Sequence, residues 1–251
     1  MSGLSYRLDG PTGAPVVVLA GSLGTTAEMW RPQLETLAAF RVLRFDHPGH
    51  GGSDLTEAAT VAAFAGRLAR LLDALGIDRV SLCGLSLGGA VAMHFAAGAP
   101  ERVERLVLAC TAARFPNAEA YGERAAAVRA NGMEPIADAI VGRWFTAAFR
   151  DAQPATVRRY RDMLVSTLPE GYARGCEAVR DFDARDTLGR VTAPSLVIAG
   201  ADDPATTPEV CAGLADAIDG ARLVVLDGAA HLANVEQPES FARALVSHLQ
   251  S

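Results

Sequence analysis

Residues 80–97 read VSLCGLSLGGAVAMHFAA, and this stretch contains the motif that decides the fold. Val80 to Cys83 is an apolar run typical of a buried strand, and the residues from Ser86 to Gly98 are typical of a helix. The turn between them, Gly84-Leu85-Ser86-Leu87-Gly88, matches G-x-S-x-G. A serine on such a bend projects its hydroxyl above a sheet, and flanking glycines relieve the crowding. We therefore predict Ser86 to be a nucleophile at the N-terminus of a helix, where developing negative charge is favoured.

Strand-like and helix-like segments alternate on both sides of this motif. We expect strands at residues 4–9, 16–20, 41–45, 80–83, 103–110, 195–199 and 222–226. We expect helices at residues 30–39, 64–75, 86–98, 208–218 and 238–249. This order predicts right-handed crossovers and a mostly parallel sheet with helices on both faces, which is an α/β fold.

The alternation stops between residues 114 and 187, where the pattern is helical, arginine-rich and aromatic-bearing. We expect two parts: a core made of residues 1–113 and 188–251, and a helical lid made of residues 114–187. The lid should cover the carboxyl ends of the strands, because open α/β sheets bind their ligands there.

Composition excludes several kinds of partner and chemistry. The chain has 251 residues and a net charge of −6, without a basic run, so nucleic acid and anionic membranes are not expected partners. All 23 basic residues are arginine, which excludes lysine-dependent Schiff bases and phosphate loops. No apolar run approaches the roughly 20 residues of a membrane helix, and the first ten residues are polar. Four scattered cysteines fit a reducing compartment, so we expect a cytoplasmic protein.

A serine hydroxyl needs a base to take its proton and an acid to orient that base. His231 follows the last strand and is the predicted base. We expect His47 and His50 to be structural, His94 to be a core or packing residue, and His248, near the C-terminus, to have no catalytic role. Asp203, three residues after the glycine that ends the strand at 195–199, is the predicted acid, with Asp202 as its rival. The order Ser, Asp, His is the order expected of α/β-hydrolases.

Ester hydrolysis also needs backbone N–H groups directed at the oxyanion. One should belong to Leu87, the residue after the nucleophile. The other should come from the loop Gly21-Ser22-Leu23-Gly24, where spacing to Trp30 favours Leu23 and leaves Ser22 as the alternative.

Several motifs resemble those of the 3-oxoadipate enol-lactonases, which are α/β-hydrolases. The matching segments are residues 21–25 followed by Met29-Trp30, residues 46–51, 84–89, 143–146, 171–173, 176–178 and 205–208. The resemblance covers nearly the whole chain and implies hydrolysis of 3-oxoadipate enol-lactone to 3-oxoadipate in aromatic catabolism. It implies a Ser-His-Asp mechanism that requires no metal, nucleotide or flavin.

The implied substrate is a small lactone with a free carboxylate, which calls for a cation in a net negative protein. Arg143 and Trp144 are our candidates, because guanidinium pairs with carboxylate and an aromatic wall suits a flat ring. Trp144 could instead pack the lid onto the core, with Arg143 in solvent. The lesser candidates are Arg114, Arg124 and Arg129.

Two other classes of function remain open. One is another serine hydrolase of the same fold, such as a carboxylesterase, a perhydrolase or a carbon–carbon bond hydrolase. The other is a non-catalytic binding module, which an intact triad disfavours. The sequence leaves the oligomeric state open.

Overall fold

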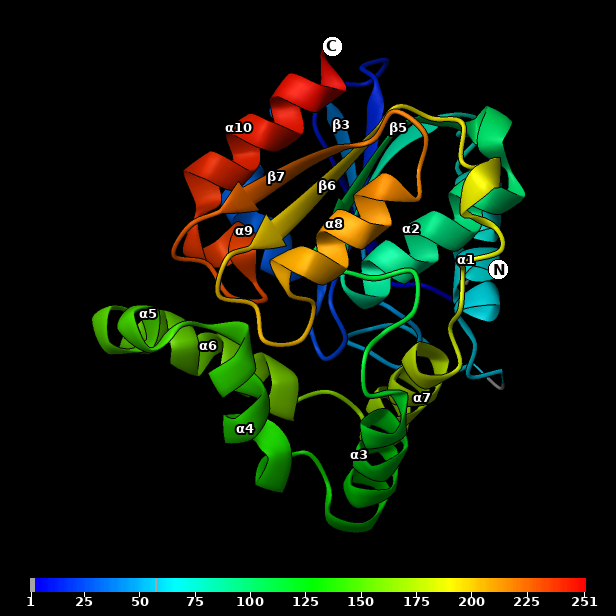
Figure 1. Ribbon diagram of the computed structural model, residues 1–251. Coiled ribbons are helices and arrows are strands. Elements are labelled where there is room, and N and C mark those ends of the chain that lie inside the picture. Colours follow the sequence, from blue (N-terminus) through cyan, green and yellow to red (C-terminus); the bar gives the residue numbers. More distant parts are fainter. Residues whose placement is uncertain (1–2, 57) are drawn as a thin grey trace.

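The computed structural model describes residues 3–56 and 58–251, in which one central sheet lies between layers of helices (Figure 1). In these residues the sheet has seven strands in the order β1-β3-β2-β4-β5-β6-β7. The strands are β1 (Tyr6–Asp9), β2 (Val16–Ala20), β3 (Arg41–Phe45), β4 (Val80–Leu85), β5 (Val103–Ala109), β6 (Ser195–Gly200) and β7 (Arg222–Leu226). The edge strand β1 is antiparallel to β3, and the other neighbouring pairs are parallel. The predicted α/β fold with a mostly parallel sheet is confirmed.

Helices cover both faces of the sheet. On one face lie α1 (Val61–Ala74), α2 (Leu87–Gly98) and α8 (Pro208–Asp216). On the other face lie the 3₁₀ helix η1 (Ala27–Gln33), α9 (Ala233–Glu236) and α10 (Pro238–Leu249). Two short 3₁₀ turns, η2 (Pro100–Arg102) and η3 (Leu188–Arg190), precede β5 and β6.

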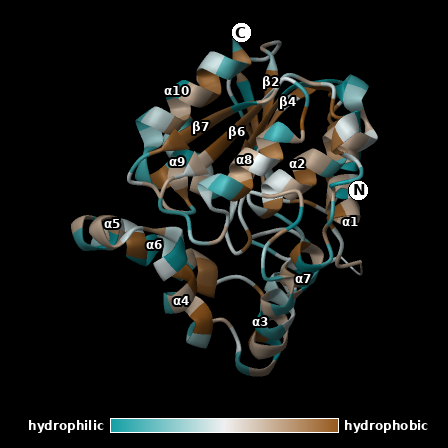
Figure 2. Cartoon of the chain, in the orientation of Figure 1, coloured by the Kyte–Doolittle hydropathy of each residue, from teal (hydrophilic) through white to brown (hydrophobic). Residues whose placement is uncertain are grey.

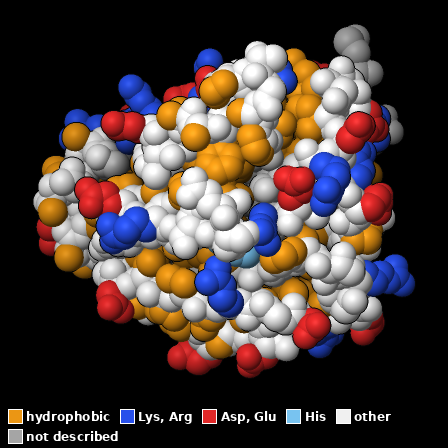
Figure 3. All heavy atoms as spheres, turned by 90° about the horizontal axis from the view of Figure 1, so that it is seen from above, with side chains coloured by type: hydrophobic (Ala, Val, Ile, Leu, Met, Phe, Trp, Pro, Cys, Tyr) orange, Lys and Arg blue, Asp and Glu red, His pale blue; other side chains and the backbone are white. Residues whose placement is uncertain are grey.

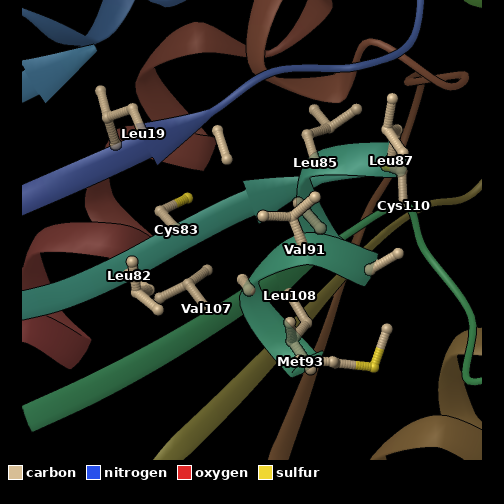
Figure 4. Packing of buried hydrophobic residues seen from close by; sticks show 14 of the residues in the cluster. Leu19, Leu82, Cys83, Leu85, Leu87, Val91, Met93, Val107, Leu108 and Cys110 are labelled. Atoms are coloured by element: carbon tan, nitrogen blue, oxygen red, sulfur yellow. The ribbon is translucent and has the colours of Figure 1, made fainter. Parts of the chain in front are cut away.

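The central strands are apolar because helices exclude water from both of their faces. Figure 2 shows them as the most hydrophobic part of the chain, and every residue of β4 and β6 is buried. Side chains of β4, β5 and α2 pack closely in this core (Figure 4). All four cysteines are buried and free, as expected of small core residues.

The helix predicted at residues 30–39 is wrong in extent and type. The chain instead forms η1, which begins earlier, and then continues in turns. Pro32 lies inside this segment and has no N–H to donate, so it interrupts the bonding pattern of a regular α-helix. Trp30 is fully buried here, and its ring lies 6.0 Å from that of Phe241 in α10.

Between β5 and β6 the chain forms five helices, which we call the inserted helices. They are α3 (Ala118–Asn131), α4 (Glu134–Trp144), α5 (Ala147–Ala152), α6 (Pro154–Val165) and α7 (Pro169–Arg180). They lie beyond the carboxyl ends of the strands, at the bottom of Figure 1. Helix α3 packs on α7, and α4 packs on α6. The two connections to the sheet run side by side, because Arg114 and Asp183 form an antiparallel bridge.

Charged side chains of both signs are interspersed on the face seen in Figure 3. Such mixing creates no extended field of one sign on that face. Among the described residues, no helix has the length and apolar character that crossing a bilayer requires.

Candidate active site

Ser86 lies on the bend between β4 and α2 and has φ 58° and ψ −116°. This left-handed conformation costs a non-glycine residue about 1–3 kcal/mol, so its surroundings must hold it. The Ser86 N–H donates to the carbonyl of Ala109 (2.9 Å), and the Ser86 carbonyl accepts from the Thr111 hydroxyl (2.9 Å). The structure thus contains the strand–turn–helix that the sequence predicts.

The glycines around Ser86 allow a close approach of backbones. A β-carbon at Gly84 would collide with the backbone of Gly88, and one at Gly88 would collide with the carbonyl of Ala20. The Gly88 N–H also donates to the carbonyl of Gly21 (2.9 Å). Helix α2 therefore begins directly against the end of β2, which brings Ser86 next to the loop that follows β2.

Asp203 and His231 come from the loops after β6 and β7, which are adjacent strands. The Nδ1 atom of His231 lies 2.8 Å from Oδ2 of Asp203, and both side chains are buried. Asp203 also accepts hydrogen bonds from the Ala205 N–H (2.8 Å), the Thr206 N–H (3.2 Å) and the Thr206 hydroxyl (2.7 Å). These donors fix the carboxylate, and the carboxylate fixes the imidazole.

The surroundings keep Asp203 ionised. Burial alone would raise the pKa of Asp203, but the charge of His231 and the hydrogen bonds outweigh it, so the pKa lies below its ordinary value. Asp202, the rival candidate, is exposed. Geometry therefore favours Asp203 as the partner of the imidazole.

Ser86 and His231 line one narrow cavity of about 40 Å³. Its other lining residues come from the loop after β2, from the inserted helices and from the loop after β6: Ser22, Leu23, Tyr121, Arg124, Ile140, Arg143, Trp144, Tyr172, Val179 and Ala205. Since a water needs roughly 10–15 Å³, this space is wide enough for a few waters. Two wider depressions of about 610 Å³ lie along α3 and α8 and along α4 and α5, but Ser86 lines neither.

The loop after β2 presents Leu23 as a free N–H donor. The Ser22 N–H donates to the sulfur of Met29 (3.2 Å), and the Gly24 N–H donates to Nε2 of His50 (3.0 Å). Among the described residues no acceptor is bonded to the Leu23 N–H, which lies between these two. Leu87 is the first residue of α2, and the N–H of a first helical residue has no partner within its helix. The two predicted oxyanion donors are thus both available.

His47 and His50, expected to be structural, form hydrogen bonds that hold the loop after β2 in place. Nε2 of His47 donates to the carbonyl of Gly21 (2.8 Å), while Nδ1 of His50 donates to the carbonyl of Pro48 (3.1 Å). These hydrogen bonds to Gly21 and Gly24 are tertiary contacts, and no local sequence motif predicts them. His94, expected in packing, is instead exposed on α2, and His248 is buried against Pro194.

Trp144 and Arg143, at the end of α4, both line the cavity with Ser86. Trp144 is buried and Arg143 is exposed. The Trp144 carbonyl accepts from the Leu232 N–H (3.0 Å), next to His231. Of the lesser candidates, Arg124 lines the cavity, whereas Arg114 lines the depression at α3 and Arg129 pairs with Glu170 and Glu177 on the surface.

Sequence reasoning missed Glu236, which joins α4 and α5 to the histidine loop. Its carboxylate accepts from the N–H (2.9 Å) and hydroxyl (2.8 Å) of Thr146 and from the N–H of Ala230 (2.5 Å). Burial is the main cause that raises the pKa of Glu236. A periodic apolar pattern gives no sign of such a contact between distant segments.

Comparison with known proteins places this geometry in a family. The model described as the alpha/beta hydrolase fold matches residues 15–238, and the chain belongs to this family. Within it, the chain is 34% identical over 249 residues to 3-oxoadipate enol-lactonase 1 of Acinetobacter baylyi, which covers 99% of this chain and 93% of that protein. The resemblance to enol-lactonases, which are carboxylic ester hydrolases, is confirmed.

Solved structures agree. The enol-lactonase from Burkholderia xenovorans LB400 is 41% identical and superposes with a TM-score of 0.96, covering 99% of this chain and 96% of that chain. A thermophilic esterase from Thermogutta terrifontis, with malate bound, is 33% identical with a TM-score of 0.92, covering 98% and 93%. The chain is thus an ester hydrolase by relationship as well as by fold.

Proposed function

We propose that the protein hydrolyses 3-oxoadipate enol-lactone to 3-oxoadipate, with Ser86, His231 and Asp203 as a catalytic triad. The observation that carries this proposal is the 2.8 Å contact between His231 and Asp203, beside a strained serine that lines the same cavity as the imidazole. The enol-lactonases among its relatives supply the substrate. The relative that holds malate supports a small carboxylate as the ligand class.

In the first half-reaction, the Ser86 hydroxyl attacks the lactone carbonyl while Nε2 of His231 takes its proton. Asp203 stabilises the imidazolium from the Nδ1 side. The ring C–O bond then breaks, and His231 returns the proton to the leaving enol oxygen. The enol becomes a ketone, so it leaves more readily than an alkoxide.

In the second half-reaction, His231 activates a water that attacks the acyl-enzyme and releases Ser86. The N–H groups of Leu23 and Leu87 stabilise the oxyanion in both halves, and one such donor contributes roughly 10²- to 10³-fold in rate. Hydrolysis adds a second carboxylate, so the product is a dianion. No cofactor takes part in this scheme.

The inserted helices serve as a lid in this proposal, with residues 114–187 as the lid and residues 1–113 and 188–251 as the core. Trp144 forms an apolar wall for the ring, and Arg143 attracts the substrate at the cavity mouth. The support is that both side chains line the cavity of Ser86 although they belong to α4.

The direct test is Ser86→Ala with the enol-lactone as substrate. We expect the loss of lactone ultraviolet absorbance to slow by at least about 10³-fold, because the nucleophile is gone. His94→Gln, an exposed change on the same helix, is the matched control and should retain full activity. Wild-type enzyme that leaves the lactone intact would contradict the proposed substrate.

A second candidate is hydrolysis of simple carboxylic esters, which the similarity to the Thermogutta terrifontis esterase favours. Turnover of p-nitrophenyl acetate without turnover of the lactone would support it. A non-catalytic binding module would leave Ser86 unlabelled by a fluorophosphonate probe, whereas either hydrolase should be labelled.

A further inference from the structure

We propose that Arg124 is the carboxylate receptor of the cavity and selects substrates that carry one carboxylate on a small ester or lactone. This inference rests on the proposed function and deepens it, since it assigns the charged end of the substrate to α3 rather than to Arg143 on α4. The receptor consists of Arg124, with Tyr121 and Tyr172 beside it.

Arg124 lines the same cavity as Ser86 and His231. Its central carbon is 4.9 Å from the centre of the Tyr121 ring, and its Nη1 is 3.5 Å from the hydroxyl of Tyr172. Stacking on an aromatic ring holds a guanidinium flat and leaves its other N–H groups free to donate. Arg124 is thus held by two neutral groups, Tyr121 and Tyr172, and it lines the cavity.

Arg124 is half-buried, and no carboxylate among the described residues forms an ion pair with it. The other arginines of α3, α6 and α7 that enter ion pairs have nearby acids: Arg129 with Glu170 and Glu177, Arg161 with Glu134 and Asp138, Arg174 with Glu170, and Arg180 with Asp181. Removing a cation from water without an anion is costly, and an incoming carboxylate removes that cost. The missing partner of Arg124 is therefore supplied by the ligand.

Arg143 also lines the cavity, but its side chain is exposed and also lines the outer depression along α5. Charges in solvent interact weakly and are screened by salt, whereas a half-buried charge in a narrow cavity acts more strongly. Arg143 can steer an anion toward the opening, and Arg124 binds it within reach of Ser86.

The kinetic test compares Arg124→Gln with Arg143→Gln on two substrates, the anionic enol-lactone and the neutral p-nitrophenyl acetate. We expect Arg124→Gln to lower kcat/KM on the lactone by about 10- to 100-fold, as loss of a charged hydrogen bond does. Turnover of the neutral ester should change by less than about threefold, which also shows that the variant folds. Arg124→Lys should restore part of the loss, since it restores the charge.

A binding test separates this inference from the proposed substrate. Adipate, a dicarboxylate without the reacting ester, is titrated calorimetrically into the wild type, Arg124→Gln and Arg161→Gln. The last is a matched control, because Arg161 already pairs with Glu134 and Asp138 and does not line the cavity. We expect Arg124→Gln to weaken adipate binding at least tenfold and Arg161→Gln to leave it unchanged.

The outcomes are distinct. If the lactone is not hydrolysed but adipate binds through Arg124, the receptor stands and the proposed substrate is rejected. If the lactone is hydrolysed and Arg124→Gln changes neither its kcat/KM nor adipate binding, the receptor is rejected and the proposed function stands. A larger loss for Arg143→Gln than for Arg124→Gln on the lactone would also overturn the assignment.

Discussion

His50 shows how a single buried side chain can set the shape of the loop that follows β2. Its Nε2 accepts from the Gly24 N–H, and its Nδ1 donates to the Pro48 carbonyl, so only one neutral tautomer satisfies both contacts. Burial lowers the pKa of His50 to about 4 and keeps the ring neutral at ordinary pH. His50 holds Gly24, and Gly24 adjoins Leu23, the proposed oxyanion donor.

We predict that His50→Leu lowers kcat by about 10- to 100-fold, because the unpaired Gly24 N–H lets the loop move its donor away. KM should change by less than about threefold, since the pocket walls are intact. His50→Gln offers an acceptor and should restore part of kcat. Steady-state kinetics on the lactone test this prediction. A change in KM alone, with kcat unchanged, would refute the positioning role of His50.

At the scale of an element, the start of α2 tolerates no side chain at Gly88. A β-carbon there would collide with the carbonyl of Ala20 at the end of β2. Contact between a helix terminus and a strand end has no room to relax, because both are buried in the core.

We predict that Gly88→Ala lowers the free energy of unfolding by about 1–3 kcal/mol, as overpacking does. Gly213→Ala is the matched control, because Gly213 is exposed within α8 and an added β-carbon there meets nothing within 4 Å. That change should stabilise the protein by up to about 1 kcal/mol through helix propensity. Urea unfolding measures the stability of both variants. If Gly88→Ala destabilises the protein no more than Gly213→Ala does, helix α2 can shift to make room for the added β-carbon.

For the whole molecule, the buried pair His47 and His50 couples stability to pH. Burial is the main cause that lowers the pKa of His47 to about 3 and that of His50 to about 4, from 6.5. The unfolded chain takes up both protons near pH 6.5, but the native protein takes them up only in stronger acid. Between these limits the unfolded state binds more protons, so stability falls as pH falls.

We predict that the free energy of unfolding is about 4 kcal/mol lower at pH 5 than at pH 7, from two histidines. His50→Gln removes one of them and should show about half of this difference. Urea titrations at the two pH values measure it. A stability independent of pH over this range would mean that both rings take up protons as readily in the native protein as in the unfolded chain.

Local patterns were enough to predict the sheet, the serine bend and the Asp203–His231 contact. The reason is that each lies at the end of an apolar strand, and parallel strands end at the same edge. The helix predicted at residues 30–39 failed where Pro32 breaks the bonding pattern. The parts of the site that the inserted helices contribute could not be predicted from the sequence in the same way.

The receptor around Arg124 illustrates why. Its neighbour Tyr172 lies 48 residues away, on α7, and only the packing of α3 on α7 brings them together. Glu236 meets Thr146 across 90 residues. These two contacts between residues far apart in the sequence match no helical or strand periodicity and no motif. The sequence could therefore supply arginine candidates but could not rank Arg124 above Arg143.

The hydrogen bonds that join Thr146 to Glu236 have a consequence for engineering and for evolutionary exchange. The inserted helices cannot be transplanted as an independent module, because Thr146 is hydrogen-bonded to the carboxylate of Glu236, near the C-terminus. A chimera that imports a foreign segment lacking this threonine would remove the hydroxyl donor and leave the Glu236 carboxylate with fewer hydrogen bonds, close to the loop that carries His231. Donor segments for specificity redesign should therefore be chosen together with the segment around Glu236 that receives them.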